Sequence, residues 1–67
     1  MTTCTYKIEV REEHALVALM EDGRDIEWVG LTDEEAARRR VPEWGRRYSL
    51  PIDETMRDVE AGIKRWA

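Results

Sequence analysis

The sequence predicts an α+β domain in which a three-stranded antiparallel sheet is followed by two helices. Three observations lead to this fold class. Apolar and polar residues alternate over much of the first 30 residues, as in strands with one buried face. An Asp-Gly pair at 22–23 separates two such segments, which is a strong signal for a hairpin. From residue 32 onward the apolar residues follow the three-and-four spacing of helices.

The first two strands are expected at about 5–11 and 15–21. Tyr6, Ile8 and Val10 alternate with charged residues, which is typical of a strand with one wet face. The second segment is apolar on both sides and too short for a helix, so it suits the centre of a sheet.

The third strand is expected at about 25–30, after a two-residue turn at Asp22-Gly23. Turns of this length fix the register of a hairpin. With a similar turn at Glu12-Glu13, both hairpins place one apolar set on a single face of the sheet. The expected buried face consists of Tyr6, Ile8, the pair Leu19–Ile26 and the pair Val17–Trp28. The opposite face is expected to be mixed and wetter.

The first helix is expected at about 33–41. The segment Thr32-Asp33-Glu34-Glu35 has the form of a capping box, in which the threonine oxygen accepts a backbone hydrogen bond and Glu35 reaches back. Pro42 disfavours a helical conformation of the residue before it, so the helix is expected to end there. Residues 42–48 are compatible with either a single helical turn or a loop.

The second helix is expected at about 50–66, with Ser49 or Leu50 as the cap. Pro51 falls in the first turn, where its missing N–H costs nothing. Gly62 is either tolerated or required by a close approach to the sheet. The apolar stripe consists of Ile52, Met56, Val59, Ile63 and Trp66. Both helices are expected on one face of the sheet, within a single domain spanning 1–67.

Charge divides the chain into two unlike halves. Residues 1–37 contain three basic and ten acidic residues, a net charge of −7, whereas residues 38–67 contain eight basic and five acidic residues, a net charge of +3. Such asymmetry indicates a charged partner, unless ion pairs between the halves neutralise it. The acidic half is suited to imitate the spaced negative charge of a nucleic acid. The candidate partner-binding residues are Glu9, Glu12, Glu13, Glu21, Asp22, Asp25, Glu27, Asp33, Glu34 and Glu35.

Residues that catalysis or metal binding would need are sparse. Cys4 and His14 are the only cysteine and histidine, too few for a zinc site. Paired carboxylates act as acids and bases only in a desolvating cleft, which a chain of 67 residues rarely builds. We therefore expect no enzymatic activity, cofactor or metal. A single cysteine suits a reducing compartment, so a cytoplasmic location is expected, and no apolar run reaches the roughly 18 residues of a membrane span.

The size, the acidic segment from Glu21 to Glu35 and the order of three strands and two helices resemble small phage-encoded anti-CRISPR proteins. Proteins of this type block a CRISPR effector, often by occupying its nucleic-acid-binding surface. The resemblance implies a non-enzymatic inhibitor that presents an acidic surface to a basic protein partner, with a CRISPR effector subunit as the expected partner. It concerns the type of protein and carries over no individual residue.

Two alternatives stay open. Residues 6–10 and 32–36 resemble the strand and helix start of HicB-type antitoxins, although that family's Pro- and Gly-containing stretch between them is missing. An antitoxin or nucleic-acid-binding module would use the basic clusters Arg38–Arg40 and Arg46–Arg47, but the net charge of −4 argues against direct nucleic-acid binding. The other alternative is a small structural protein that dimerises through an edge strand or an apolar stripe. We expect a monomer or a weak homodimer.

Overall fold

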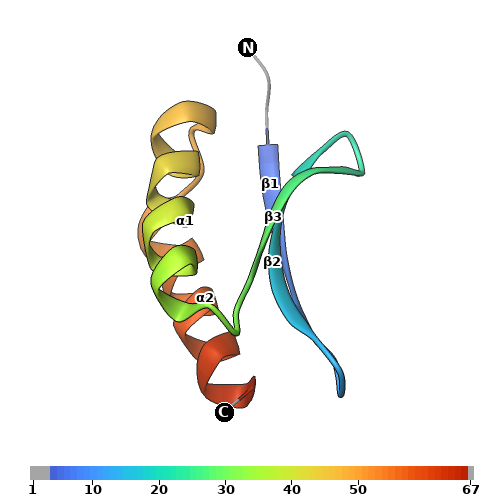
Figure 1. Ribbon diagram of the computed structural model, residues 1–67. Coiled ribbons are helices and arrows are strands. Elements are labelled where there is room, and N and C mark those ends of the chain that lie inside the picture. The colour runs from blue at the N-terminus through green and yellow to red at the C-terminus, as the bar shows by residue number, and fades with distance from the viewer. Residues whose placement is uncertain (1–3, 67) are drawn as a thin grey trace.

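The computed structural model describes residues 4–66 and confirms the predicted fold class. The elements in chain order are β1 (Cys4–Val10), β2 (Ala15–Glu21), β3 (Arg24–Gly30), α1 (Glu34–Tyr48) and α2 (Ile52–Trp66). The strands form one antiparallel sheet in the order β1-β2-β3. Both helices lie on the same face of this sheet, so the described residues leave its other face uncovered (Figure 1).

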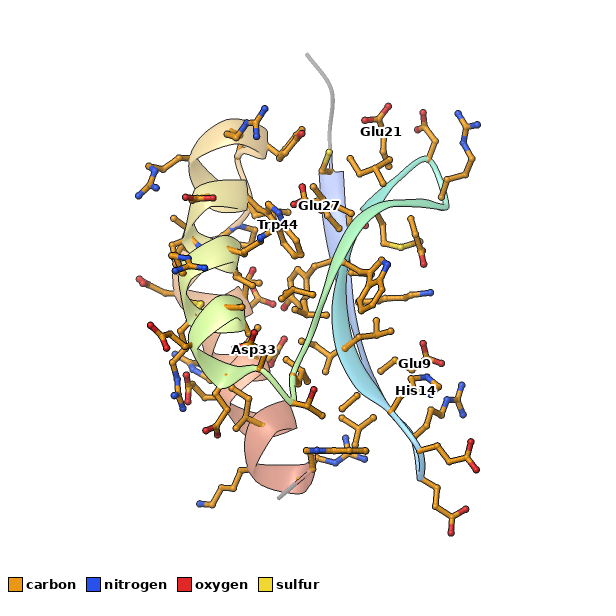
Figure 2. The ribbon with its side chains drawn as sticks, viewed as in Figure 1. Glu9, His14, Glu21, Glu27, Asp33 and Trp44 are labelled. Atoms are coloured by element: carbon orange, nitrogen blue, oxygen red, sulfur yellow. The ribbon has the colours of Figure 1, made fainter. Side chains whose placement is uncertain are left out.

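The hydrophobic core lies between the sheet and the helices, with α2 mainly over β1 and α1 mainly over β3. Figure 2 shows Trp44 between α1 and the sheet, and its side chain is only 2% exposed. Helix α2 approaches the sheet closely at Gly62, where a Cβ would lie 2.8 Å from Leu31 Cδ1 and 3.1 Å from Ile8 Cγ2. Of the two interpretations of Gly62, close approach is confirmed.

The predicted pairing of β1 with β2 is confirmed. Tyr6 lies opposite Leu19 and Ile8 opposite Val17. The backbone N–H of Arg11 donates to the carbonyl of His14 at 2.7 Å and closes the two-residue turn between the strands.

The turn between β2 and β3 also has the predicted form. Glu21 lies opposite Arg24, so Asp22 and Gly23 make the turn. Their φ angles are +51° and +78°, the positive values that the favoured two-residue hairpin turn requires.

Beyond this turn the predicted register of β3 is wrong, because the strand contains a β-bulge. Met20 pairs with Asp25, but its neighbour Leu19 pairs with Glu27. Ile26 is therefore an extra residue without a partner on β2. Since side chains alternate between the faces of a strand, one extra residue moves every later side chain to the opposite face.

The bulge reverses the expected placement of Trp28. Trp28 lies opposite Ala18 and is 62% exposed, and Ile26 is 45% exposed, although both were predicted to be buried. Val29 takes the inward position and is 8% exposed, followed by the fully buried Leu31. The core thus gains the aliphatic side chains of Val29 and Leu31. The chain then continues into α1 on the face of the sheet that the helices cover.

The predicted end of the first helix at Val41 is wrong, because α1 continues through Pro42 to Tyr48. A proline inside a helix removes one backbone hydrogen bond and crowds the preceding turn. Here the apolar stripe continues on both sides of it, with Val41 1% and Trp44 2% exposed and Tyr48 packed against the core. Burial of these large side chains offsets the cost of the proline.

The caps also differ from the predicted ones. Asp33 caps α1, one residue later than expected, and its Oδ1 accepts from the backbone N–H of Ala36 at 3.2 Å. Ser49 ends α1 in a left-handed conformation instead of starting the next helix. The first bond of α2 joins the N–H of Thr55 to the carbonyl of Pro51 at 2.9 Å, so α2 begins two residues later than predicted.

Deletion of Ile26 should leave all other pairs of the β2–β3 hairpin unchanged, because this residue has no partner. We expect the free energy of unfolding, measured in urea, to stay within about 1 kcal/mol of the parent value. In a sheet without the bulge, the same deletion would turn Trp28 out of the core and cost several kcal/mol. Deletion of Ala18, which pairs with both neighbouring strands, is the matched control and should abolish folding.

Candidate protein-binding surface

The face of the sheet that points away from the helices, the outer face, displays apolar side chains. Leu16, Ala18 and Met20 lie on it because they alternate with the buried residues of β2. Trp28 lies on the same face, directly opposite Ala18. Ala18 has no exposed surface although no described helix covers it, so side chains of the outer face itself must shield it.

An exposed tryptophan on an uncovered sheet face is the most conspicuous feature of this surface. Tryptophan carries a large apolar area and is enriched among the residues that dominate binding energy in protein interfaces. Leu16 and Met20 are half-buried beside Trp28, and Ile26 is exposed at the bulge on the same strand. We call Leu16, Met20, Ile26 and Trp28 the outer patch. The sequence pattern missed this patch because Trp28 fits the alternation of a buried face equally well.

Charged side chains border the outer patch. Lys7 on β1 and Asp25 on β3 form an ion pair of 3.4 Å, and both side chains are about half exposed. At the other end of the face, Glu9 accepts a hydrogen bond of 2.9 Å from Arg11 Nε and lies 3.8 Å from His14 (Figure 2). The hydrogen bond from Arg11 holds the pKa of Glu9 below its usual value.

The ten candidate acids do not form one continuous surface. They lie at the β1–β2 turn (Glu12, Glu13), at the start of α1 (Asp33, Glu34, Glu35), within strands (Glu9, Glu27) and at or beside the β2–β3 turn (Glu21, Asp22, Asp25). In Figure 2, Glu21 lies near the top of the molecule, whereas Asp33 lies well below it at the start of α1. Glu27 is turned toward α1 and accepts from Arg40 at 2.6 Å, while Asp33 is engaged as a cap. The acids directly beside the outer patch are Glu9, opposite Leu16, and Asp25, opposite Met20 next to the β2–β3 turn.

The basic clusters are partly neutralised on the helices. Arg38 donates two hydrogen bonds to Glu60, at 2.7 and 2.8 Å, which lower the pKa of Glu60 and raise that of Arg38. Of the four ion pairs that join Lys or Arg to acids among the described residues, only Arg40–Glu27 connects the two halves of opposite charge. Most of the charge separation therefore remains. The other arginines of the clusters, all exposed, are Arg39, Arg46 and Arg47.

A groove of about 390 Å³ lies between β1 and α2. Tyr6 and Ile8 line it from the strand, and Asp58, Ala61 and Arg65 line it from the helix. The hydroxyl of Tyr6 donates a hydrogen bond to Asp58, and this bond, with a smaller effect of burial, raises the pKa of Tyr6 to about 12. The groove therefore holds a tyrosine that stays protonated at neutral pH, unlike a group tuned for proton transfer.

A scan against protein-family models finds no match for this chain, and searches of curated proteins and of solved structures find no similar protein. Among the helices within residues 4–66, none is long and apolar enough to cross a membrane. The same residues contain no group of three or more His, Cys, Asp or Glu side chains placed to hold a metal ion.

Tyr6 should ionise only in strongly alkaline solution. The bond to Asp58 contributes stability that is fully present below the ordinary tyrosine pKa near 10 and is lost as the pH rises through about 12. We expect Tyr6→Phe to lower the free energy of unfolding at pH 7 by about 1 kcal/mol. In a spectrophotometric titration, subtracting the curve of this variant should isolate a tyrosine with a pKa near 12. A difference curve centred near 10 would contradict the hydrogen bond.

Proposed function

We propose that this protein is a non-enzymatic interaction protein that binds a basic surface of a partner protein through the outer face of its β2–β3 hairpin. The observation that carries this proposal is the 62% exposure of Trp28 on a sheet face that no described helix covers. A rigid strand presents this side chain, so its burial in a partner would cost little conformational entropy.

The acids of the hairpin supply the second component of the surface. Glu21, Asp22 and Asp25 lie on the hairpin that carries Trp28, at or beside its turn. A partner that covers the outer patch also meets Asp22 in the turn and Asp25 opposite Met20, and these carboxylates favour basic residues around its apolar pocket. Glu21 alternates to the helix side, where it accepts a hydrogen bond from Cys4. The remaining acids of residues 1–37 add to a negative field, which speeds the encounter with a basic surface over longer distances.

The chemistry of the other features favours binding over catalysis. Tyr6 has a pKa raised to about 12, away from the range useful for acid–base catalysis. Cys4 is buried, and burial, followed by the charges of Glu21 and Asp22, raises the pKa of its thiol. A thiol of this kind is a poor nucleophile and suits a reducing, cytoplasmic environment.

A nucleic-acid-binding site on a CRISPR effector complex is the partner that we propose, as for small anti-CRISPR inhibitors. Such a site presents lysine and arginine side chains that normally contact phosphates. The carboxylates of the β2–β3 turn would take the place of phosphates, and Trp28 would fill an adjacent apolar or aromatic site. The inhibitor would therefore compete with target DNA.

A second candidate function, nucleic-acid binding by the helical arginines, is favoured by one arrangement. The guanidinium of Arg47 lies 5.7 Å from the centre of the Tyr48 ring, and Arg39 and Arg46 are exposed on the same helix. A filter-binding titration with duplex and single-stranded DNA at low salt tests it. Binding with a steep salt dependence, abolished by changing these three arginines to Ala, would favour this function over the first.

Purified CRISPR effector complexes loaded with guide RNA provide a direct assay. Their binding to target DNA should be inhibited by the parent protein, and Trp28→Ala should weaken inhibition by roughly 30-fold, the effect of losing a dominant interface residue. Asp22→Lys should weaken it by about tenfold and reduce its dependence on salt.

Glu34→Lys is the matched control, since it makes the same charge change at the start of α1, which follows the end of β3 away from the β2–β3 turn. It should alter only the long-range attraction and so have a smaller effect than Asp22→Lys. Inhibition that is unaffected by both Trp28→Ala and Asp22→Lys would refute the proposed surface. Parent protein that leaves target binding by all tested effectors unchanged would refute this choice of partner.

A further inference from the structure

Strand β1 forms an open edge of the sheet, next to the groove that it shares with α2. The order β1-β2-β3 leaves one side of β1 unpaired by the described residues. Because Arg11 bonds to His14 at the end of the hairpin, the alternation of an antiparallel ladder directs the backbone groups of Lys7 and Glu9 toward β2. The N–H and C=O groups of Tyr6 and Ile8 then point to the open edge. Such groups are a template for a further strand.

The helix beside this edge carries an ordered series of charges. Glu54, Asp58, Ala61 and Arg65 are spaced four, three and four residues apart, so they lie on one side of α2, and all four are exposed. Asp58 and Arg65 line the groove, and Glu54 is near enough to raise the pKa of Tyr6. This side of α2 is thus acidic in its first half, small at Ala61 and basic in its last turn.

Helix α2 runs in the same direction as β1. Tyr6 contacts Asp58, and Ile8, later in the strand, lies next to Gly62, later in the helix. A two-fold axis perpendicular to the sheet would therefore make two copies of β1 antiparallel and two copies of α2 antiparallel at the same time. Both sets of contacts are satisfied by one symmetry operation.

We propose that two copies of this chain associate through β1 and α2, joining their sheets edge to edge into one continuous sheet. In this arrangement Asp58 of each copy faces Arg65 of its partner, and the two small Ala61 side chains meet near the axis. A second copy fits better than an unrelated extended peptide. A peptide could pair with the backbone of β1, but it would leave the charges of α2 unmatched. An antiparallel copy of α2 places its basic last turn beside the acidic first half of the other helix, and so complements it.

The dimer leaves the outer face free, so it goes beyond the proposed function and does not depend on it. It would also present two outer patches side by side on one continuous sheet. For a chain of 67 residues, which buries only about 60% of its unfolded surface, the added interface would be a substantial source of stability.

Sedimentation equilibrium at low salt, from about 1 µM to about 1 mM protein, tests the dimer. The parent should form dimers with increasing concentration. Asp58→Arg and Arg65→Glu, made singly, should each raise the dissociation constant by at least about tenfold, and the double variant should restore it. The two residues are seven positions apart, about 10 Å along one helix, so such rescue must arise between copies.

Three further variants complete the test. Ala61→Glu places two like charges at the axis, on an exposed helical position. This variant should be monomeric in sedimentation equilibrium and folded by circular dichroism. Tyr6→Phe removes the bond to Asp58 without changing a charge, so it should leave dimerisation intact. Trp28→Ser should also leave it intact. A parent that stays monomeric to about 1 mM, dimers insensitive to the α2 variants, or dimers abolished by Trp28→Ser would each overturn the proposal.

Discussion

Strand β3 has to meet two requirements that a regular strand of its sequence cannot satisfy together. The turn at Asp22-Gly23 fixes Glu21 opposite Arg24, and the core requires Val29 to point toward the helices. With strict alternation from this turn, Val29 would point outward. One extra residue at Ile26 resolves the conflict, and the remainder of the structure depends on it. Glu27 turns inward to Arg40, and Trp28 turns outward.

The same arrangement divides the molecule into surfaces with different chemistry. Both helices cover one face of the sheet (Figure 1). Trp28 lies on the other face, opposite Ala18, and is exposed. Ion pairs engage Glu9, Asp25 and Glu27 of the strands, whereas Glu12 and Glu13 of the β1–β2 turn and Asp22 of the β2–β3 turn stay exposed. At the open edge of the sheet, β1 presents backbone hydrogen-bonding groups. Beside it, α2 presents acidic side chains in its first half and a basic side chain in its last turn. One small domain therefore offers a face and an edge that are independent of each other.

Local patterns predict the elements of this fold and most of their pairing. Alternation predicts the two outer strands, a short apolar run predicts the central strand, the Asp-Gly turn fixes the start of β3, and the apolar spacing locates α2. The bulge could not be predicted in this way. Ile26 and Trp28 fit the alternation of an inward-facing set as well as Glu27 and Val29, which take the inward positions in the structure. The choice depends on the burial of Val29 and Leu31 under the helices, which is a tertiary effect. Pro42 is a similar case, since a local rule against helix is overridden by the burial of Trp44.

The candidate surface was predictable in its charge and not in its geometry. The acidic residues are evident in the sequence, but their separation at opposite ends of the sheet follows from the lengths of the strands. The apolar component was assigned to the wrong face, because a single extra residue reverses the orientation of Trp28. The sequence groups the basic residues into clusters, but two of them, Arg38 and Arg40, are bonded to acids from other elements.

The pairing of Trp28 across β2 is the most direct test of this account. The bond between Leu31 N–H and the Ala15 carbonyl makes Ala18 and Trp28 a pair without mutual backbone hydrogen bonds, in which Cα atoms lie about 4.5 Å apart. A nuclear Overhauser spectrum of the parent should therefore show a strong cross-peak between the α protons of Ala18 and Trp28. A strong cross-peak between the α protons of Ala18 and Glu27 instead would mean that β3 has no bulge, and would contradict the account.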